Sequence, residues 1–197
     1  MSRMKGKKDG SVLMTEGVIW KQLVIFSIPL LIGNLFQQLY NTVDSIVVGQ
    51  FIGSEALAAL GSSTPLINLI IGMFMGIAVG SGVIISQYYG AKSEDKMGWA
   101  VHTSIALSII GGILLSVVGI VFSPSILRLM KTPPEVLDTS VLYFRIYFLG
   151  SLFNLLYNMG AGILQAVGDS RRPLIFLCFS SVTNIVLDLL FVAGFHM

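Results

Sequence analysis

Five long apolar segments follow a polar N-terminal arm of residues 1–20. They cover residues 21–49, 65–88, 99–122, 135–167 and 173–194, and short polar or charged stretches separate them. A helix rises about 1.5 Å per residue, so each segment is long enough to cross roughly 30 Å of hydrocarbon. The pattern predicts an all-α integral membrane protein, built as a bundle of five transmembrane helices.

The first segment carries a stripe of polar side chains that ends in an acid, Asp44. Steps of three and four residues place them on one face of a helix, and they are Asn34, Gln37, Gln38 and Asn41. Because a carboxylate at membrane depth costs about 3 kcal/mol or more, such a stripe usually faces a cavity and lines a substrate path. A polar seam between packed helices is the alternative. Pro29, near the start of the segment, removes a backbone hydrogen bond and predicts a bend.

Small residues dominate one face of the second and third segments. They recur at Gly72, Gly76 and Gly80, and again at Ser104, Ser108, Gly112, Ser116 and Gly119. Such faces let another helix approach closely, so both predict helix packing. Pro65, after three potential capping residues, is expected at the first position of the second helix.

The last two segments carry further polar positions. Asn154 and Asn158 share a helical face and are expected to line the same path as the first stripe. In the fifth segment, Asn184 and Asp188 lie one turn apart. Arg145 is interpreted as snorkelling to the outer interface, with a substrate-facing role as the alternative.

Composition supports a membrane protein and excludes several function classes. Hydrophobic residues make up 54% of the chain and charged residues 11%, and the mean hydropathy is +0.85. A net charge of +2 is too small for a nucleic-acid-binding surface. Basic residues gather in the N-terminal arm and in the second and fourth loops, which predicts a cytoplasmic N-terminus in the cell membrane. No catalytic or cofactor motif is present, so we expect no enzyme and no cofactor.

Asp44 and Asp188 both fall in the outer halves of their segments, and we expect them to share one cavity. Two neighbouring carboxylates take up a proton readily. Their oxygens, with the amide oxygen of Asn184, also suit a hard cation such as Na⁺. Competition between that ion and an organic cation for one site would support antiport.

Several stretches in order resemble the multidrug and toxic compound extrusion (MATE) transporters of bacteria. They are Pro29 with Asp44; Gly53-Ser54-Glu55-Ala56-Leu57-Ala58-Ala59; Ser86-Gln87 with Gly90-Ala91; Gln165 with Gly168-Asp169 and Pro173; and Asn184 with Asp188. The resemblance implies a cell-membrane antiporter that exports small organic cations in exchange for Na⁺ or H⁺. It also implies that Asp44, Asn184 and Asp188 form a cation site, and that Pro29 is a bend that responds to protonation.

The chain departs from that family in length. The resemblance implies about twelve spans in two lobes, and the five predicted here lack the last helix of the first lobe and the whole second half of the transporter. We therefore expect a fragment that does not transport alone. Two alternatives stay open: an exporter of lipid-linked precursors or polysaccharides with a related fold, and a non-transporting membrane subunit. A short echo joins Leu35-Phe36-x-x-Leu39-Tyr40-Asn41 to Leu152-Phe153-x-x-Leu156-Tyr157-Asn158.

Overall fold

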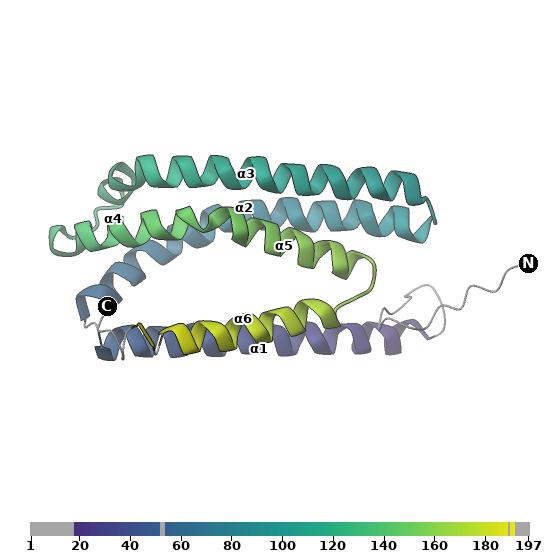
Figure 1. Ribbon diagram of the computed structural model, residues 1–197, viewed down its shortest axis with the longest axis horizontal. Coiled ribbons are helices and arrows are strands. Elements are labelled where there is room, and N and C mark those ends of the chain that lie inside the picture. Colours follow the sequence, from purple (N-terminus) through teal and green to yellow (C-terminus); the bar gives the residue numbers. More distant parts are fainter. Residues whose placement is uncertain (1–17, 52–53, 189, 192–197) are drawn as a thin grey trace, which may run out of the picture.

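The computed structural model describes residues 18–51, 54–188 and 190–191, and these residues form helices joined by short turns (Figure 1). The helices are α1 (Ile19–Phe51), α2 (Ser54–Gly90), α3 (Glu94–Leu129), α4 (Pro134–Leu149), α5 (Ser151–Ala166) and α6 (Arg171–Asp188). The prediction of an all-α helical bundle is confirmed.

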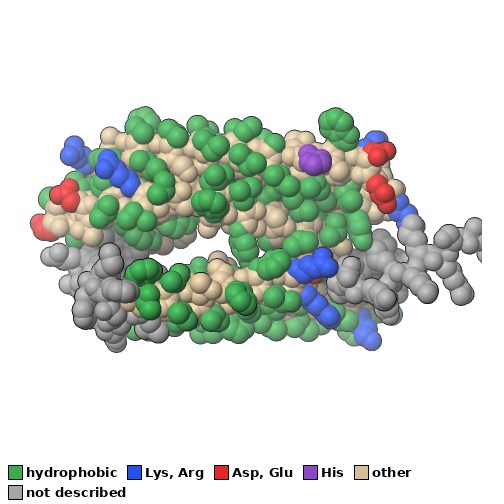
Figure 2. Space-filling model, in the orientation of Figure 1, with side chains coloured by type: hydrophobic (Ala, Val, Ile, Leu, Met, Phe, Trp, Pro, Cys, Tyr) green, Lys and Arg blue, Asp and Glu red, His purple; other side chains and the backbone are tan. Residues whose placement is uncertain are grey.

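The helices form two groups that lie side by side. Helices α2 to α5 pack on one another, while α1 packs mainly on α6 and has only slight contact with α2. Figure 2 shows the consequence as a hollow between the α1/α6 pair and the larger group. We call this hollow the central cleft.

The core of the larger group lies between α3 and the α4/α5 pair. Phe144 and Phe148 are fully buried there with their ring centroids 4.6 Å apart. Helix α3 comes close because it presents glycines: a Cβ added to Gly112 would lie 2.7 Å from Leu152 Cα, and one added to Gly119 would lie 2.6 Å from Phe148 Cβ. The small-residue face predicted for the third segment is therefore confirmed as a packing face.

The glycine stripe of α2 behaves differently. A Cβ added to Gly72, Gly76 or Gly80 would meet nothing within 4 Å, so the prediction that this stripe packs on another helix is wrong for the described chain. Helix α2 instead buries the opposite face, where Ile67 and Ala78 lie. Sequence spacing identified a face of small residues but not its neighbour.

Two predicted boundaries are also wrong. Pro65 lies inside α2, which begins at Ser54, because the Ala-rich stretch expected as a loop is helical. The fourth segment is two helices, α4 and α5, bent by 47° at Gly150. A Gly-Ser pair is a common cause of such a bend, and Ser151 Oγ here donates to the Phe148 carbonyl at 2.8 Å instead of facing away.

The described helices suit a membrane. By length and hydropathy, α1, α2 and α3 can each cross one, and the bent α4–α5 pair can form a fourth span. Helix α6 corresponds to the fifth predicted segment. Its 18 described residues include Arg171, Arg172 and Asp188, which is more charge than a span of that length normally holds.

Candidate ion and substrate site

Helices α1 and α6 form a parallel pair, because both run from the right of Figure 1 to the left. Gly33 marks where they meet. A Cβ at this position would lie 3.4 Å from Leu177 Cδ2 and 3.6 Å from Leu174 Cδ1. Gly33 of α1 is therefore level with this turn of α6, and this contact fixes the register of the two helices.

The register brings the predicted acid positions to one level. Position 44 follows Gly33 by eleven residues, and position 188 follows Leu177 by eleven residues. Eleven residues are about three turns and about 16 Å of helix, so both positions return to the faces where the two helices meet. The side chains of Asp44 and Asp188 lie outside the described residues, and their role in ion binding stays a prediction.

Asn184 lies on the same side of α6, seven residues after Leu177. Its Oδ1 is buried and accepts no hydrogen bond from the described residues. The residue also lines an open groove of about 670 Å³ along α6, together with Phe176, Phe179 and Thr183 among others. An unsatisfied buried acceptor costs about 1–3 kcal/mol, so this oxygen is suited to receive a ligand.

The polar stripe of α1 is uncovered. Asn34, Gln37, Gln38 and Asn41 are all exposed, as a lining of a polar path requires. Helix α1 continues through Pro29 without a break. A substrate path along this stripe and a bend at Pro29 remain predictions.

The two asparagines of α5 bond to each other. Asn158 Nδ2 donates to Asn154 Oδ1 at 2.8 Å and to the Asn154 carbonyl at 2.9 Å. Asn158 also lines a cavity of about 160 Å³ between α2, α3 and α5, beside Phe74 and Ser108. Asn158 and Ser108 are thus polar positions in a mostly apolar cavity wall, and the role of the asparagine pair in a substrate path stays a prediction.

Three tyrosines that the sequence analysis did not select belong to helices on opposite sides of the central cleft. Tyr40 of α1 lies close enough to Tyr147 of α4 and Tyr157 of α5 to interact electrostatically, and Cys178 of α6 lies near Tyr157. The short sequence echo contains Tyr40 and Tyr157 at matching places, and it was the only signal for them. Tyr147 and Tyr157 are thus both within electrostatic range of Tyr40 on α1, and we expect their rings to face the central cleft.

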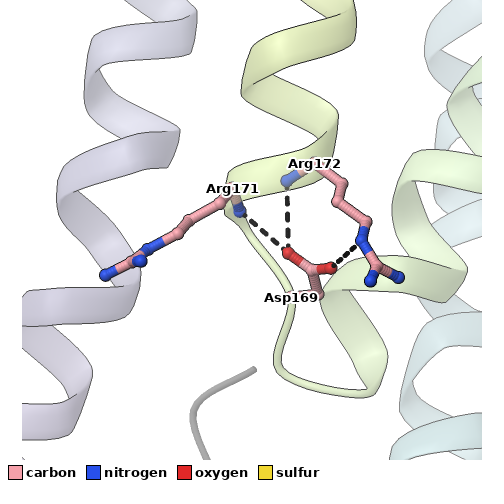
Figure 3. A network of polar contacts seen from close by, with 3 residues as sticks. All are labelled: Asp169, Arg171 and Arg172. Atoms are coloured by element: carbon pink, nitrogen blue, oxygen red, sulfur yellow. Dashed lines mark hydrogen bonds and ion pairs between the residues drawn. The ribbon is translucent and has the colours of Figure 1, made fainter. Parts of the chain in front are cut away.

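A third acid, Asp169, has a structural role (Figure 3). Its Oδ1 accepts hydrogen bonds from the backbone N–H groups of Arg171 at 3.1 Å and Arg172 at 3.2 Å, and its Oδ2 lies 3.2 Å from Arg172 Nε. The carboxylate caps the first turn of α6, where negative charge is favourable. Gly168 supplies the preceding left-handed turn with φ 86°. Asp169 is therefore committed to the turn between α5 and α6.

Comparison with known proteins gives consistent matches. The MatE family model matches residues 29–190. The chain is 38% identical over 169 residues to the "Probable multidrug resistance protein YoeA" of Bacillus subtilis, and 26% identical over 182 residues to the "Multidrug export protein MepA" of Staphylococcus haemolyticus. These matches cover 86% and 92% of the chain but only 36% and 40% of the two relatives.

Solved structures agree with this match. One described as "Crystal structure of MATE in complex with MaD3S" superposes with a TM-score of 0.87 at 31% identity, covering 96% of this chain and 42% of the other. A MOP superfamily transporter from Pyrococcus furiosus gives a TM-score of 0.88 at 31% identity, covering 96% and 42%. The chain thus spans about two fifths of the length of these proteins.

Proposed function

Because the chain belongs to the MatE family, we propose that it forms the N-terminal part of a secondary antiporter that exports cationic amphiphilic drugs in exchange for Na⁺ or H⁺. The names of the relatives refer to multidrug resistance and export, which supports drugs as the cargo. The relatives are more than twice as long as this chain, which supports a second half as the missing partner. Transport then requires both parts.

The observation that carries the proposal is the register of α1 and α6. Contact at Gly33 sets positions 44 and 188 at one level, and the unsatisfied Oδ1 of Asn184 lies one turn before position 188. Two carboxylates and an amide oxygen are suitable ligands for Na⁺. The same two carboxylates, when close together, favour uptake of one proton.

Ion binding at these positions would couple to cargo through competition. A cationic drug is attracted to the negative charge of the two acids, and a bound Na⁺ or H⁺ removes part of that charge. Binding of one cation therefore weakens binding of the other by the same factor, which is the linkage that antiport requires. The aromatic rings of Tyr40, Tyr147 and Tyr157 suit the cargo itself, since a ring face attracts an organic cation.

The proposed setting is the cell membrane, with the N-terminus in the cytoplasm. Lys21 at the start of α1 and Arg171 at the start of α6 lie toward one end of the pair, and Lys92 and Lys96 flank the α2–α3 turn. This end of the bundle carries more basic residues than the α3–α4 turn with Arg128 and Lys131, which supports placing this end on the cytoplasmic side of the membrane.

Efflux from vesicles tests the coupling site. The full-length transporter that contains this chain is reconstituted, and efflux of a fluorescent cationic dye is driven by a Na⁺ or a H⁺ gradient. Asp44→Asn and Asp188→Asn are expected to abolish gradient-driven efflux, and Asn184→Ala to raise the ion concentration needed for half-maximal rate. Asp138→Asn, at an exposed acid near the start of α4, is the matched control and should transport normally.

The outcome distinguishes the parts of the proposal. Loss of driven efflux in both acid variants, with normal insertion and normal transport by the control, supports the coupling site and identifies the ion. Normal transport by both acid variants would show that the coupling site lies elsewhere. No efflux by the wild-type protein under either gradient would contradict drug antiport itself.

A further inference from the structure

Arg145 holds a positive charge inside the bent span formed by α4 and α5. It lies eleven residues after Pro134, the first residue of α4, which is about 16 Å along the helix. A charge at membrane depth is costly and normally has a partner. No ion pair to an acid involves Arg145 in the described chain, so its charge is not neutralised by the described residues.

Its Nε atom is nevertheless held in place by α3. Pro124 lies inside α3 and has no backbone N–H, so the carbonyl of Ile120, four residues earlier, loses its normal helical partner. Arg145 Nε donates to this carbonyl at 3.3 Å and to Ser123 Oγ at 3.2 Å. Ser123 Oγ donates to the same carbonyl at 3.1 Å. The proline in one helix thus creates the acceptor that positions the arginine of the next.

The rest of the guanidinium faces away from the central cleft. Tyr147 interacts electrostatically with Tyr40 of α1 and so marks the side of α4 that faces α1, and Arg145 is two residues, or about 200° around the helix, from it. Its neighbours on the outward side are apolar and exposed. They are Leu142 and Ile146 of α4, and Val121 of α3, which follows Ile120, the residue whose carbonyl accepts from Arg145. Nη1 and Nη2 make no hydrogen bond to the part of the chain that the structure describes, and the side chain is exposed. Two parallel donors therefore point out from a surface that suits lipid.

We propose that this guanidinium fork binds the phosphate group of a phospholipid in the leaflet next to the α3–α4 turn. A guanidinium with its Nε already held presents two N–H groups in the geometry of a phosphate oxyanion. Among the groups available at a lipid-facing surface, the phospholipid phosphate supplies the missing negative charge. The sequence analysis interpreted Arg145 as snorkelling to the interface. In this proposal the side chain is instead held in place, and the lipid headgroup moves toward it. A substrate-facing role is disfavoured because Arg145 lies on the far side of α4 from the cleft.

Lipid retention during native mass spectrometry tests the site. Detergent-purified protein is incubated with equal amounts of a diacyl phosphatidylglycerol and of the corresponding diacylglycerol, which has the same chains without a phosphate. The wild-type protein is expected to retain the phospholipid about tenfold better, the factor that one charge-assisted contact supplies. Arg145→Gln should reduce retention to the level of the diacylglycerol, whereas Arg128→Gln, at an exposed arginine near the end of α3, should leave it unchanged.

A second variant and a competition experiment complete the test. Arg145→Lys keeps the charge but lacks the fork, and it should retain the phospholipid several-fold less well even if Arg145→Gln fails to fold. Inorganic phosphate added in excess should not displace the lipid. Unchanged retention in the folded Arg145 variants would overturn the proposal. Full displacement by inorganic phosphate would show an aqueous oxyanion site instead of a lipid site.

Discussion

The substitution Gly119→Ala tests the packing of α3 most directly. The added Cβ would lie 2.5 Å from Phe148 Cδ1 and 2.6 Å from Phe148 Cβ, well inside normal contact distance. Phe148 cannot easily move away, because it is fully buried and its ring packs on Phe144. Either α3 must shift outward or the phenylalanine must leave its rotamer.

The size of the effect follows from two opposing terms. Overpacking of a dense core costs about 1–3 kcal/mol, and replacing glycine by alanine inside a helix returns about 0.5–1 kcal/mol. The net loss is therefore about 0–2.5 kcal/mol in the free energy of unfolding relative to the wild type. For a chain of this size, each kcal/mol shifts the melting temperature by about 2–4 °C, so a decrease of up to about 10 °C is expected.

The assay is thermal unfolding in detergent, followed by far-ultraviolet circular dichroism, with Gly98→Ala as the matched control. Gly98 lies in the same helix, and a Cβ there would meet nothing within 4 Å, so this variant should be as stable as the wild-type protein or slightly more stable. Equal melting temperatures for Gly119→Ala and Gly98→Ala would refute the packing of α3 against Phe148 described above.

Two further predictions concern the α5–α6 turn and the central cleft. Asp169→Ala removes the cap of α6 and should lower the free energy of unfolding by about 1–2 kcal/mol, measured by the same thermal assay; a melting temperature equal to that of Asp138→Ala would contradict the capping role. Tyr40→Ala should weaken the apparent affinity for a cationic dye in the efflux assay by roughly 2- to 30-fold, while Tyr40→Phe, which keeps the ring, should retain it; similar losses in both would point to the hydroxyl instead of the ring.

The sequence was sufficient for the all-helical character of the chain and for the faces on which residues lie, because helical periodicity places residues on faces. It recognised the small-residue face of α3, whereas the grouping of Asn184 with Asp188 in an ion site stays a prediction. Periodicity does not say which face meets which neighbour, and this is why the glycine stripe of α2 was assigned to packing although it lies opposite the buried Ile67 and Ala78. Partners are decided by the packing of the whole chain.

Other features depended on contacts between distant residues. The bend at Gly150 needs the bonds of Ser151 to Phe148 and to Ser116 across to α3, and no local pattern announces them. Tyr40 belongs to the cleft only because α4 and α5 come to lie opposite α1. The position of Arg145 likewise depended on a carbonyl freed by a proline 21 residues earlier, which is apparent only when α3 and α4 are side by side.

The connections of the α1/α6 pair restrict how the central cleft can open. Helix α1 is tied to the larger group at its C-terminal end, since only two residues separate Phe51 from Ser54, and α6 is tied at its N-terminal end by the turn that Asp169 braces. The α1/α6 pair is therefore connected to the larger group at both of its ends, by two different segments of the chain. A change in the width of the cleft at either end therefore strains one of these two connections, while the close contact of Gly33 with Leu174 and Leu177 keeps α1 and α6 in register.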